Sequence, residues 1–222
     1  MQRIFDEGSD HPSEQVTVRS AYDVVRPRPT DRPWIALCMV ASIDGTTVID
    51  HRSGALSSDI DKEVLSTLRS LADLIIVGAG TVRAERYGPP AKSGQRIGVV
   101  SHSGNIDTSI PLFTSGAGFL IVPEDAPSQS IDTVRAGVGT LDLGAALAQL
   151  DADFIQAEGG PGLNGSLLDA DLVDELNLTI SPQLVGGDGQ RVTNGATAVS
   201  RGMRLAHVLE DDGFLFTRYV RR

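Results

Sequence analysis

Cysteine and long apolar runs are nearly absent from this chain of 222 residues. The single cysteine, Cys38, excludes a disulfide within the chain and argues against a cysteine-based zinc site. No stretch approaches the ~18 apolar residues that a membrane-spanning helix needs, and the first residues, MQRIFDEGSDHPSEQ, lack the apolar core of a signal peptide. We therefore expect a soluble, cytoplasmic protein without a membrane partner.

Basic residues are also few, because 19 Lys and Arg stand against 29 Asp and Glu, which gives a formal net charge of −10. Nucleic acids and anionic membranes bind basic faces, so this balance disfavours both as partners. The sequence shows no G-x-S-x-G elbow and no metal-ligand spacing among its histidines, so we expect neither triad chemistry nor a metal. These histidines are His11, His51, His102 and His207.

The order of apolar and polar segments predicts the architecture. Residues 1–33 are polar and proline-rich, which indicates an N-terminal extension before a domain spanning residues 34–222. In that domain short apolar runs alternate with helix-like segments, which favours an α/β fold with a largely parallel central sheet flanked by helices on both faces. Residues 203–222 turn at an Asp-Asp-Gly sequence and predict an antiparallel hairpin. The sheet should therefore be mixed.

Glycine is plentiful, with 24 residues, and follows apolar runs in three turns: MVASIDGT (39–46), IIVGAGTV (75–82) and IQAEGGPGLNGSLL (155–168). Ligands of open α/β sheets bind beyond the carboxyl ends of the strands, so the three turns could line one cleft. The last turn precedes a helix-compatible run, where unpaired backbone N–H groups suit a pyrophosphate. Alternatively, the glycines only let the chain reverse tightly after core strands.

Three charged residues stand near these turns. Glu158 ends an apolar run, where it either accepts hydrogen bonds from ligand hydroxyls or remains a solvated charge at a rim; the adjacent glycines favour the first interpretation. Arg69 lies at the border of the apolar face of a helix predicted over 59–72, with acidic residues in its first turn, and taken alone it fits a solvated arginine near the C-terminal dipole. Asp44 is expected to bond to the backbone of its own turn.

Three ordered blocks carry a family resemblance: ALCMVASIDG, LRSLADLIIVGAGTVRAERYGP and QAEGGPGLNGSLLDADLVDELNLTISPQLVGG. From Pro33 to Arg221 the chain resembles the pyrimidine reductases of riboflavin biosynthesis, which also form the C-terminal domain of the bifunctional deaminase-reductase. The resemblance implies a dihydrofolate-reductase-like fold and a homodimer. It also implies NADPH-dependent reduction of the ribosyl group of a 5-amino-6-(ribosylamino)pyrimidine phosphate to ribityl, by hydride delivery to C1′ of an open-chain imine.

The resemblance also implies site residues. Those expected at the cofactor are Val40, Gly78, Gly80, Thr81, Val82, Ser101, Gly159, Gly160, Pro161, Gly162, Leu163 and Asn164, with Ser103 as an alternative to Ser101 at the 2′-phosphate. Those expected at the substrate are Ser42, Arg69, Lys92 and Glu158. Glu158 and Glu85 are the candidates for catalytic roles near the reacting ribose.

The chain departs from the family pattern in several places. We expect no zinc deaminase activity from these residues, because they contain neither the H-x-E nor the P-C-x-x-C motif of the deaminase half. Bifunctional members commonly carry lysine where this chain has Cys38, and Glu85 and Lys92 stand where aspartate and arginine are usual. A dihydrofolate-type or other heterocycle reductase on the same fold therefore stays open as an alternative. So does a non-catalytic nucleotide-binding homodimer.

Overall fold

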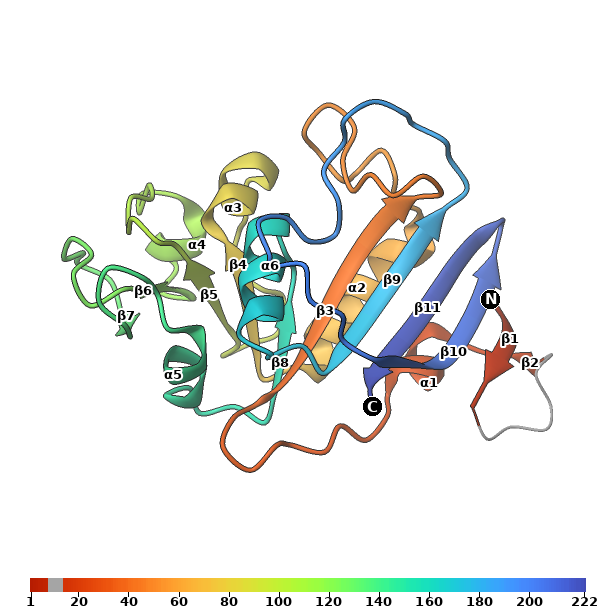
Figure 1. Ribbon diagram of the computed structural model, residues 1–222, viewed down its shortest axis with the longest axis horizontal. Helices are drawn as coiled ribbons and strands as arrows, with labels where there is room; N and C mark the ends of the chain where they lie inside the picture. The colour runs from red at the N-terminus through yellow and green to blue at the C-terminus, as the bar shows by residue number, and fades with distance from the viewer. Residues whose placement is uncertain (8–13) are drawn as a thin grey trace.

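The apolar run from residue 34 to residue 42 forms the nine-residue strand β3 (Trp34–Ser42) at the middle of one large sheet. The computed structural model describes residues 1–7 and 14–222, and in these parts the strand order is β2-β1-β10-β11-β9-β3-β8-β4-β5-β6-β7 (Figure 1). Because β3 has a partner on each side and lies between helices, its side chains are largely buried on both faces, as its continuous apolar sequence indicates.

The half of the sheet that carries the glycine turns is parallel. Next to β3 lies β8, and β4, β5, β6 and β7 follow outward, each parallel to its neighbour. These strands are β8 (Phe154–Ala157), β4 (Leu74–Gly78), β5 (Arg96–Val100), β6 (Gly118–Val122) and β7 (Thr133–Arg135). Their carboxyl ends therefore meet at one edge of the sheet, and this edge holds the candidate site.

The other half of the sheet is antiparallel beyond β9. Strand β9 (Glu175–Ser181) is parallel to β3, and the hairpin of β10 (Met203–Asp211) and β11 (Phe214–Arg221) continues the sheet in antiparallel pairing. Asp212 and Gly213 both have positive φ at the hairpin turn, as a two-residue turn that follows the twist of its strands requires. The predicted mixed, mostly parallel sheet with a C-terminal hairpin is confirmed.

Residues 1–7 and 14–33 contribute to the same sheet and core. Strand β1 (Gln2–Asp6) pairs with β10 and with the short β2 (Glu14–Gln15), and α1 (Val18–Tyr22) packs against α2. Arg26 then forms an ion pair with buried Glu175, which ties the segment to β9. The boundary at residue 33 stays a prediction, and His11 lies outside the described residues.

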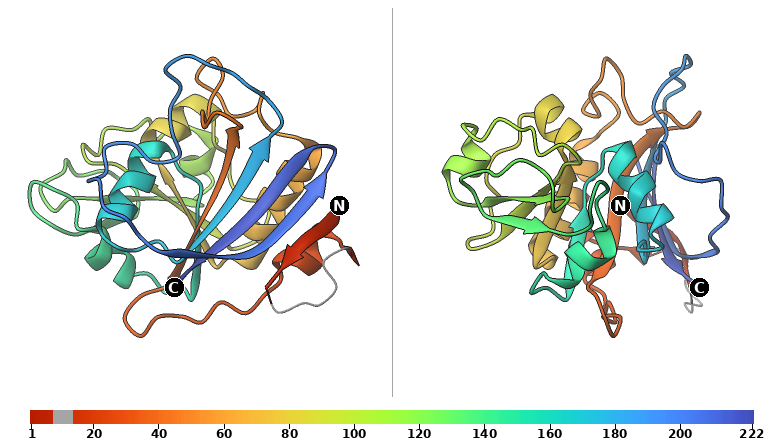
Figure 2. Two further views of the ribbon diagram at one scale, coloured as in Figure 1. Left: turned by 45° about the vertical axis from the view of Figure 1, so that its right-hand side comes forward. Right: turned by 60° about the vertical axis from the view of Figure 1, so that its left-hand side comes forward.

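Helices cover both faces of the sheet (Figure 2). Alternate residues of β4 enter different apolar clusters: Ile75 packs with α3 and α4, whereas Ile76 packs with α5 and α6. Helices α1 and α2 pack against β3 through Ala36, on the face opposite to α6. The bounds are α2 (Asp59–Leu71), α3 (Ala79–Glu85), α4 (Pro111–Thr114), α5 (Leu143–Ala148) and α6 (Pro161–Asp169). Among the described residues, no helix has the length and apolar character needed to cross a bilayer.

Candidate active site

A cavity of about 1000 Å³ opens at the carboxyl ends of β3, β4, β5 and β8. This volume is at the upper end of the range usual for ligand pockets, so it offers room for a dinucleotide and a second small molecule. The glycine turns after β4 and β8 line it, as predicted. The turn after β3 does not, because the lining residues of that segment are Met39, Val40, Thr47 and Val48 on either side of the turn.

The two glycine turns bring two helix N-termini together. Helix α3 starts directly after Gly78 and α6 directly after Gly160, and neither cap residue supplies a side-chain hydrogen bond to the first turn. The N–H of Gly78 donates to the carbonyl of Gly159 at 2.6 Å, so the turns touch. A Cβ at Gly160 would lie 2.7 Å from Oγ1 of Thr81, which explains why this close approach needs glycine.

Two further glycines face open space. A Cβ built on Gly80 or on Gly162 would meet no atom within 4 Å, and both residues line the cavity. Uncapped N–H groups with accessible backbone beside them are what a phosphate or pyrophosphate needs at a helix N-terminus. The residues present therefore fit the phosphates of a dinucleotide.

Most residues expected at the cofactor line this cavity. They are Val40, Gly78, Gly80, Thr81, Ser101, Gly160, Pro161, Gly162 and Leu163, and Ser103 lines it too. Three others do not line it, so their cofactor role stays a prediction. Val82 points into the core beneath α3, Gly159 serves the contact between the turns, and Asn164 is buried with its Nδ2 donating to the carbonyl of Val192. Val82 and Asn164 lie on helices, where residues next to a cavity-facing residue point to another side of the helix.

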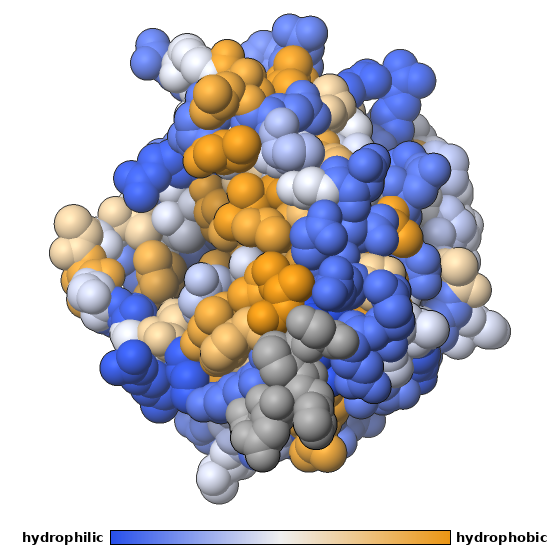
Figure 3. All heavy atoms as spheres, turned by 90° about the vertical axis from the view of Figure 1, so that its right-hand side faces the viewer, coloured by the Kyte–Doolittle hydropathy of each residue, from blue (hydrophilic) through white to orange (hydrophobic). Residues whose placement is uncertain are grey.

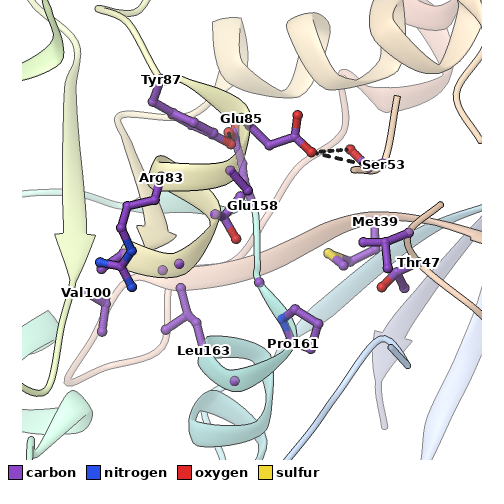
Figure 4. A pocket seen from close by; sticks show the side chains of 18 of the residues that line it. Met39, Thr47, Ser53, Arg83, Glu85, Tyr87, Val100, Glu158, Pro161 and Leu163 are labelled. Atoms are coloured by element: carbon purple, nitrogen blue, oxygen red, sulfur yellow. Dashed lines mark hydrogen bonds between the residues drawn. The ribbon is translucent and has the colours of Figure 1, made fainter. Parts of the chain in front are cut away.

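The end of β5 borders the same space. The hydroxyl of buried Ser101 accepts a hydrogen bond from the N–H of Gly104 and so shapes the loop that follows. Arg83, which sequence reasoning missed, extends from α3 beside Val100 and Leu163 (Figure 4). Within the described residues its guanidinium has no hydrogen-bond or ion-pair partner. Its position three residues after Gly80, on the same helix face, was the available signal.

The other end of the cavity contains a network centred on Glu158. Arg69 donates from Nε to Oε1 and from Nη2 to Oε2, both at 2.6 Å. The hydroxyl of Tyr87 donates to Oε2 at 2.6 Å, and Nε2 of Gln156 donates to Oε1 at 3.1 Å. Each carboxylate oxygen therefore accepts two hydrogen bonds from the protein.

Burial and charge set the protonation of this network. Burial alone would lower the pKa of Arg69, but its hydrogen bonds to Glu158 and the negative charge of Glu158 outweigh it and raise that pKa. Burial raises the pKa of the Tyr87 hydroxyl, and the charge of Glu158 raises it further. Arg69 is thus cationic and Tyr87 remains a neutral donor. The solvated-rim interpretation of Glu158 and the solvated-surface interpretation of Arg69 are both wrong.

Glu85 and Ser42 lie apart from this network. Glu85, at the end of α3, lines the cavity and accepts hydrogen bonds from the N–H and the hydroxyl of Ser53 (Figure 4). Ser42 does not line the cavity, because its hydroxyl donates to Asp44 inside the turn after β3. That bond, followed by backbone donors that include the N–H of Gly186, lowers the pKa of Asp44 to about 2. Asp44 therefore bonds to the Ser42 hydroxyl within its turn, but its backbone donors are Val185 and Gly186 after β9 rather than the backbone of its own turn. The substrate role of Ser42 stays a prediction.

Lys92 also lies away from the cavity. Its Nζ donates to the carbonyl of Ala72 at 2.7 Å, directly after the end of α2. The same carbonyl also accepts from Nε2 of Gln95 at 2.7 Å, and a cation at this place complements the negative end of the helix. Lys92 therefore stabilises the α2 terminus and does not line the cavity, and its substrate role stays a prediction.

The chain is similar in sequence to known proteins. The family described as the RibD C-terminal domain matches residues 33–214. The chain belongs to this family. It is 27% identical over 207 residues to the 2,5-diamino-6-ribosylamino-4(3H)-pyrimidinone 5′-phosphate reductase of Methanothermobacter thermautotrophicus, a match that covers 82% of this chain and 95% of that protein. The sequence-based assignment to the riboflavin pyrimidine reductases is thereby confirmed, and with it an oxidoreductase.

Solved structures of the family share the fold. A pyrimidine reductase-like protein of Corynebacterium diphtheriae superimposes with a TM-score of 0.80 at 22% identity, over 93% of this chain and 99% of that chain. A deaminase/5-amino-6-(5-phosphoribosylamino)uracil reductase of Thermotoga maritima gives 0.70 at 16% identity, over 86% of this chain and 57% of that chain. The family fold is confirmed at these identities.

Proposed function

We propose that this chain is an NADPH-dependent reductase that converts the ribosyl group of a 5-amino-6-(ribosylamino)pyrimidine 5′-phosphate, or of its 2,5-diamino relative, into ribityl. One observation carries the proposal: a single cavity has two uncapped helix N-termini with open glycines at one end and the Arg69–Glu158–Tyr87 network at the other. The first end suits a dinucleotide. The second suits a polar sugar.

Bound NADPH would supply the hydride. Gly160 and Gly162 would hold its pyrophosphate through the first turn of α6, with Thr81 beside it. Arg83 and the loop after Ser101 would receive the 2′-phosphate, because a guanidinium without a partner is the strongest available anion receptor at this end. This arrangement would favour NADPH over NADH.

The substrate half of the cavity contributes positioning. Glu158 is held by Arg69 from α2 and by Tyr87 from the segment after α3, so the network fixes the shape of the wall against which the ribose would lie. Glu158 and Glu85 remain the proposed polar groups near the reacting ribose, and both line the cavity. Glu85 is held by Ser53, so the walls around the proposed ribose position would orient the reacting atoms for hydride transfer.

A spectrophotometric assay tests the proposed reaction. The purified protein is mixed with NADPH and either pyrimidine phosphate, the loss of reduced nicotinamide is followed, and mass spectrometry looks for a product that has gained two hydrogens. Dihydrofolate serves as a third substrate, because the alternative is a dihydrofolate-type reductase. Turnover of dihydrofolate alone, or tight NADPH binding without turnover of any substrate, would overturn the proposed reaction.

We also propose that the protein is a homodimer. Apolar side chains gather on the side of the molecule where β1 and β10 lie (Figure 3), and Ile4 and Phe5 of β1 are 43% and 40% exposed. Contiguous exposed apolar side chains mark contact surfaces in many proteins. Sedimentation equilibrium tests the proposal: a single species with the mass of one chain would contradict it. The cytoplasmic location stays a prediction.

A further inference from the structure

Asp61 is a buried carboxylate that faces the substrate half of the cavity. It lies one helical turn before Leu65 and two before Arg69 on α2, and all three residues line the cavity. Only 9% of Asp61 is exposed. Its Oδ2 accepts a hydrogen bond from the hydroxyl of Ser57 at 2.6 Å. The side chain thus sits in a wall that a substrate ring would touch.

Asp61 differs from the other buried carboxylates in the described parts of the chain. Glu158 is paired with Arg69, Asp174 with Arg32, and Glu175 with both Arg26 and Arg218. No cation pairs with Asp61 among these residues, because neighbouring Lys62 forms its ion pair with Asp59. Charges taken out of water are costly unless a partner compensates them.

The thiol on this wall gives no charge compensation. Cys38 of β3 lines the cavity near Asp61, and burial, followed by the negative charge of Asp61, raises the pKa of its thiol well above the ordinary value. The thiol is therefore neutral at physiological pH. The N-terminal end of α2 favours the negative charges of both Asp59 and Asp61, but it supplies no cationic partner. A ligand that presents N–H donors is the partner that Asp61 lacks.

The two pyrimidines in the names of the relatives differ in the donors they present. A 2-amino-4(3H)-pyrimidinone carries N3–H and the 2-amino group side by side, and two parallel N–H donors match a carboxylate bidentately. A pyrimidine-2,4-dione places a carbonyl on each side of N3–H, so a carboxylate there would face a second acceptor. We propose that Asp61 recognises the C2 substituent and selects the 2-aminopyrimidinone nucleotide over the uracil nucleotide. This inference rests on the proposed function for the identity of the substrate ring.

Equilibrium binding tests the selection separately from catalysis. Calorimetry measures the affinity of the wild type for 2,5-diamino-6-ribosylamino-4(3H)-pyrimidinone 5′-phosphate and for 5-amino-6-ribosylaminouracil 5′-phosphate, with NADP⁺ present so that no reduction occurs. We expect the first to bind about 10- to 100-fold tighter, the scale of one bidentate recognition pair. Asp61→Asn should reduce that ratio to about threefold or less, because it keeps the shape and removes one of the two acceptors.

Asp59→Asn is the matched control. It removes the same charge from the same helical turn, but Asp59 is exposed and lies outside the cavity lining, so the binding ratio should remain that of the wild type. If Asp61→Asn fails to melt cooperatively, Asp61→Ser replaces it, since serine is also accepted in the first turn of a helix.

Three results overturn the inference: equal wild-type affinities, a preference that survives replacement of Asp61, or the binding of neither nucleotide. Turnover with NADPH is scored separately. Failure to reduce either nucleotide overturns the proposed reaction, whereas the binding ratio still decides the role of Asp61.

Discussion

The guanidinium of Arg69 and the carboxylate of Glu158 form a bidentate pair across the active-site cavity, with both N–O distances at 2.6 Å. Arg69 lies in the last turn of α2, and Glu158 follows β8, so the pair joins two elements that are 89 positions apart in sequence. The side chain of Glu158 is 3% exposed and that of Arg69 31%. Paired, hydrogen-bonded charges of this kind fix geometry more than they stabilise a fold.

Replacement of Glu158 tests what the pair contributes. Glu158→Gln leaves the Arg69 guanidinium without its counter-charge and breaks charge-assisted hydrogen bonds, so we expect the free energy of unfolding to fall by about 2–3 kcal/mol. For a chain of this length that lowers the melting temperature by roughly 5–10 °C in calorimetry. NADPH affinity should change less than about twofold, because the glycine turns hold the phosphates.

Asp132→Asn is the control for Glu158→Gln. Asp132 pairs with Arg96 at the surface, where the two side chains are 76% and 38% exposed, so its loss should change stability by less than about 0.5 kcal/mol. If Glu158→Gln changed stability as little as Asp132→Asn, the Arg69–Glu158 pair would contribute no more to stability than an exposed ion pair does.

The sequence predicted the elements of the fold whose own residue pattern determines their structure. Strand β3 has nine largely apolar residues, and the β10–β11 hairpin has its turn residues in place. Strands β1 and β7 were not predicted, because short strands beside an existing edge gain their stability from the neighbour rather than from their own pattern.

The sequence predicted the site residues that belong to the glycine motifs and face the cavity. The glycines of both turns were found, but Val82 was assigned to the cofactor although helical periodicity turns it into the core. The bond of Lys92 to the carbonyl of Ala72 was not predicted, because the two residues are 20 positions apart. Tyr87 and Asp61 were missed as site residues for the same reason: which charges pair, and which stay free, is decided by tertiary contacts.

Gly162 provides a test of the cofactor end. A side chain at this position would enter open cavity, so Gly162→Val should fold normally while occupying the space beside the first turn of α6. We expect NADPH affinity, measured by fluorescence titration, to fall roughly tenfold or more. Gly144→Val is matched to it, since Gly144 is also the second residue of a helix, α5, and does not line the cavity. Unchanged NADPH affinity in folded Gly162→Val would remove the α6 terminus from the binding site.

Arg83 should decide between the two nicotinamide cofactors. If its unpaired guanidinium contacts the 2′-phosphate, Arg83→Gln should weaken NADPH by about 10- to 100-fold and leave NADH within about twofold, as calorimetry would show. Arg86→Gln changes the net charge equally at another point of the cavity and should keep the wild-type preference. If Arg83→Gln lowered the affinity for both cofactors equally, Arg83 would not contact the 2′-phosphate.

His207 gives the fold a predictable response to acid. It is buried on β10 with its ring edge-on to Tyr22 at 5.0 Å. Burial, followed by the positive charges of Arg218 and Arg3, lowers its pKa from 6.5 to about 3, although Glu175 opposes this shift. Below pH 6.5 the unfolded chain therefore takes up a proton that the folded protein does not bind until about pH 3.

The stability contribution of neutral His207 is thus complete above pH 6.5 and decreases as the pH falls toward 3. One proton of difference corresponds to about 1.4 kcal/mol per pH unit, so urea unfolding should show a loss of about 2 kcal/mol between pH 6.5 and about pH 5 from this residue. His207→Gln should be less stable at neutral pH. Its free energy of unfolding should fall by about 2 kcal/mol less than that of the wild type over this pH interval. His102→Gln, at an exposed position, should keep the wild-type slope. If His207→Gln follows the wild-type slope, His207 takes up its proton equally in both states, and its depressed pKa would be refuted.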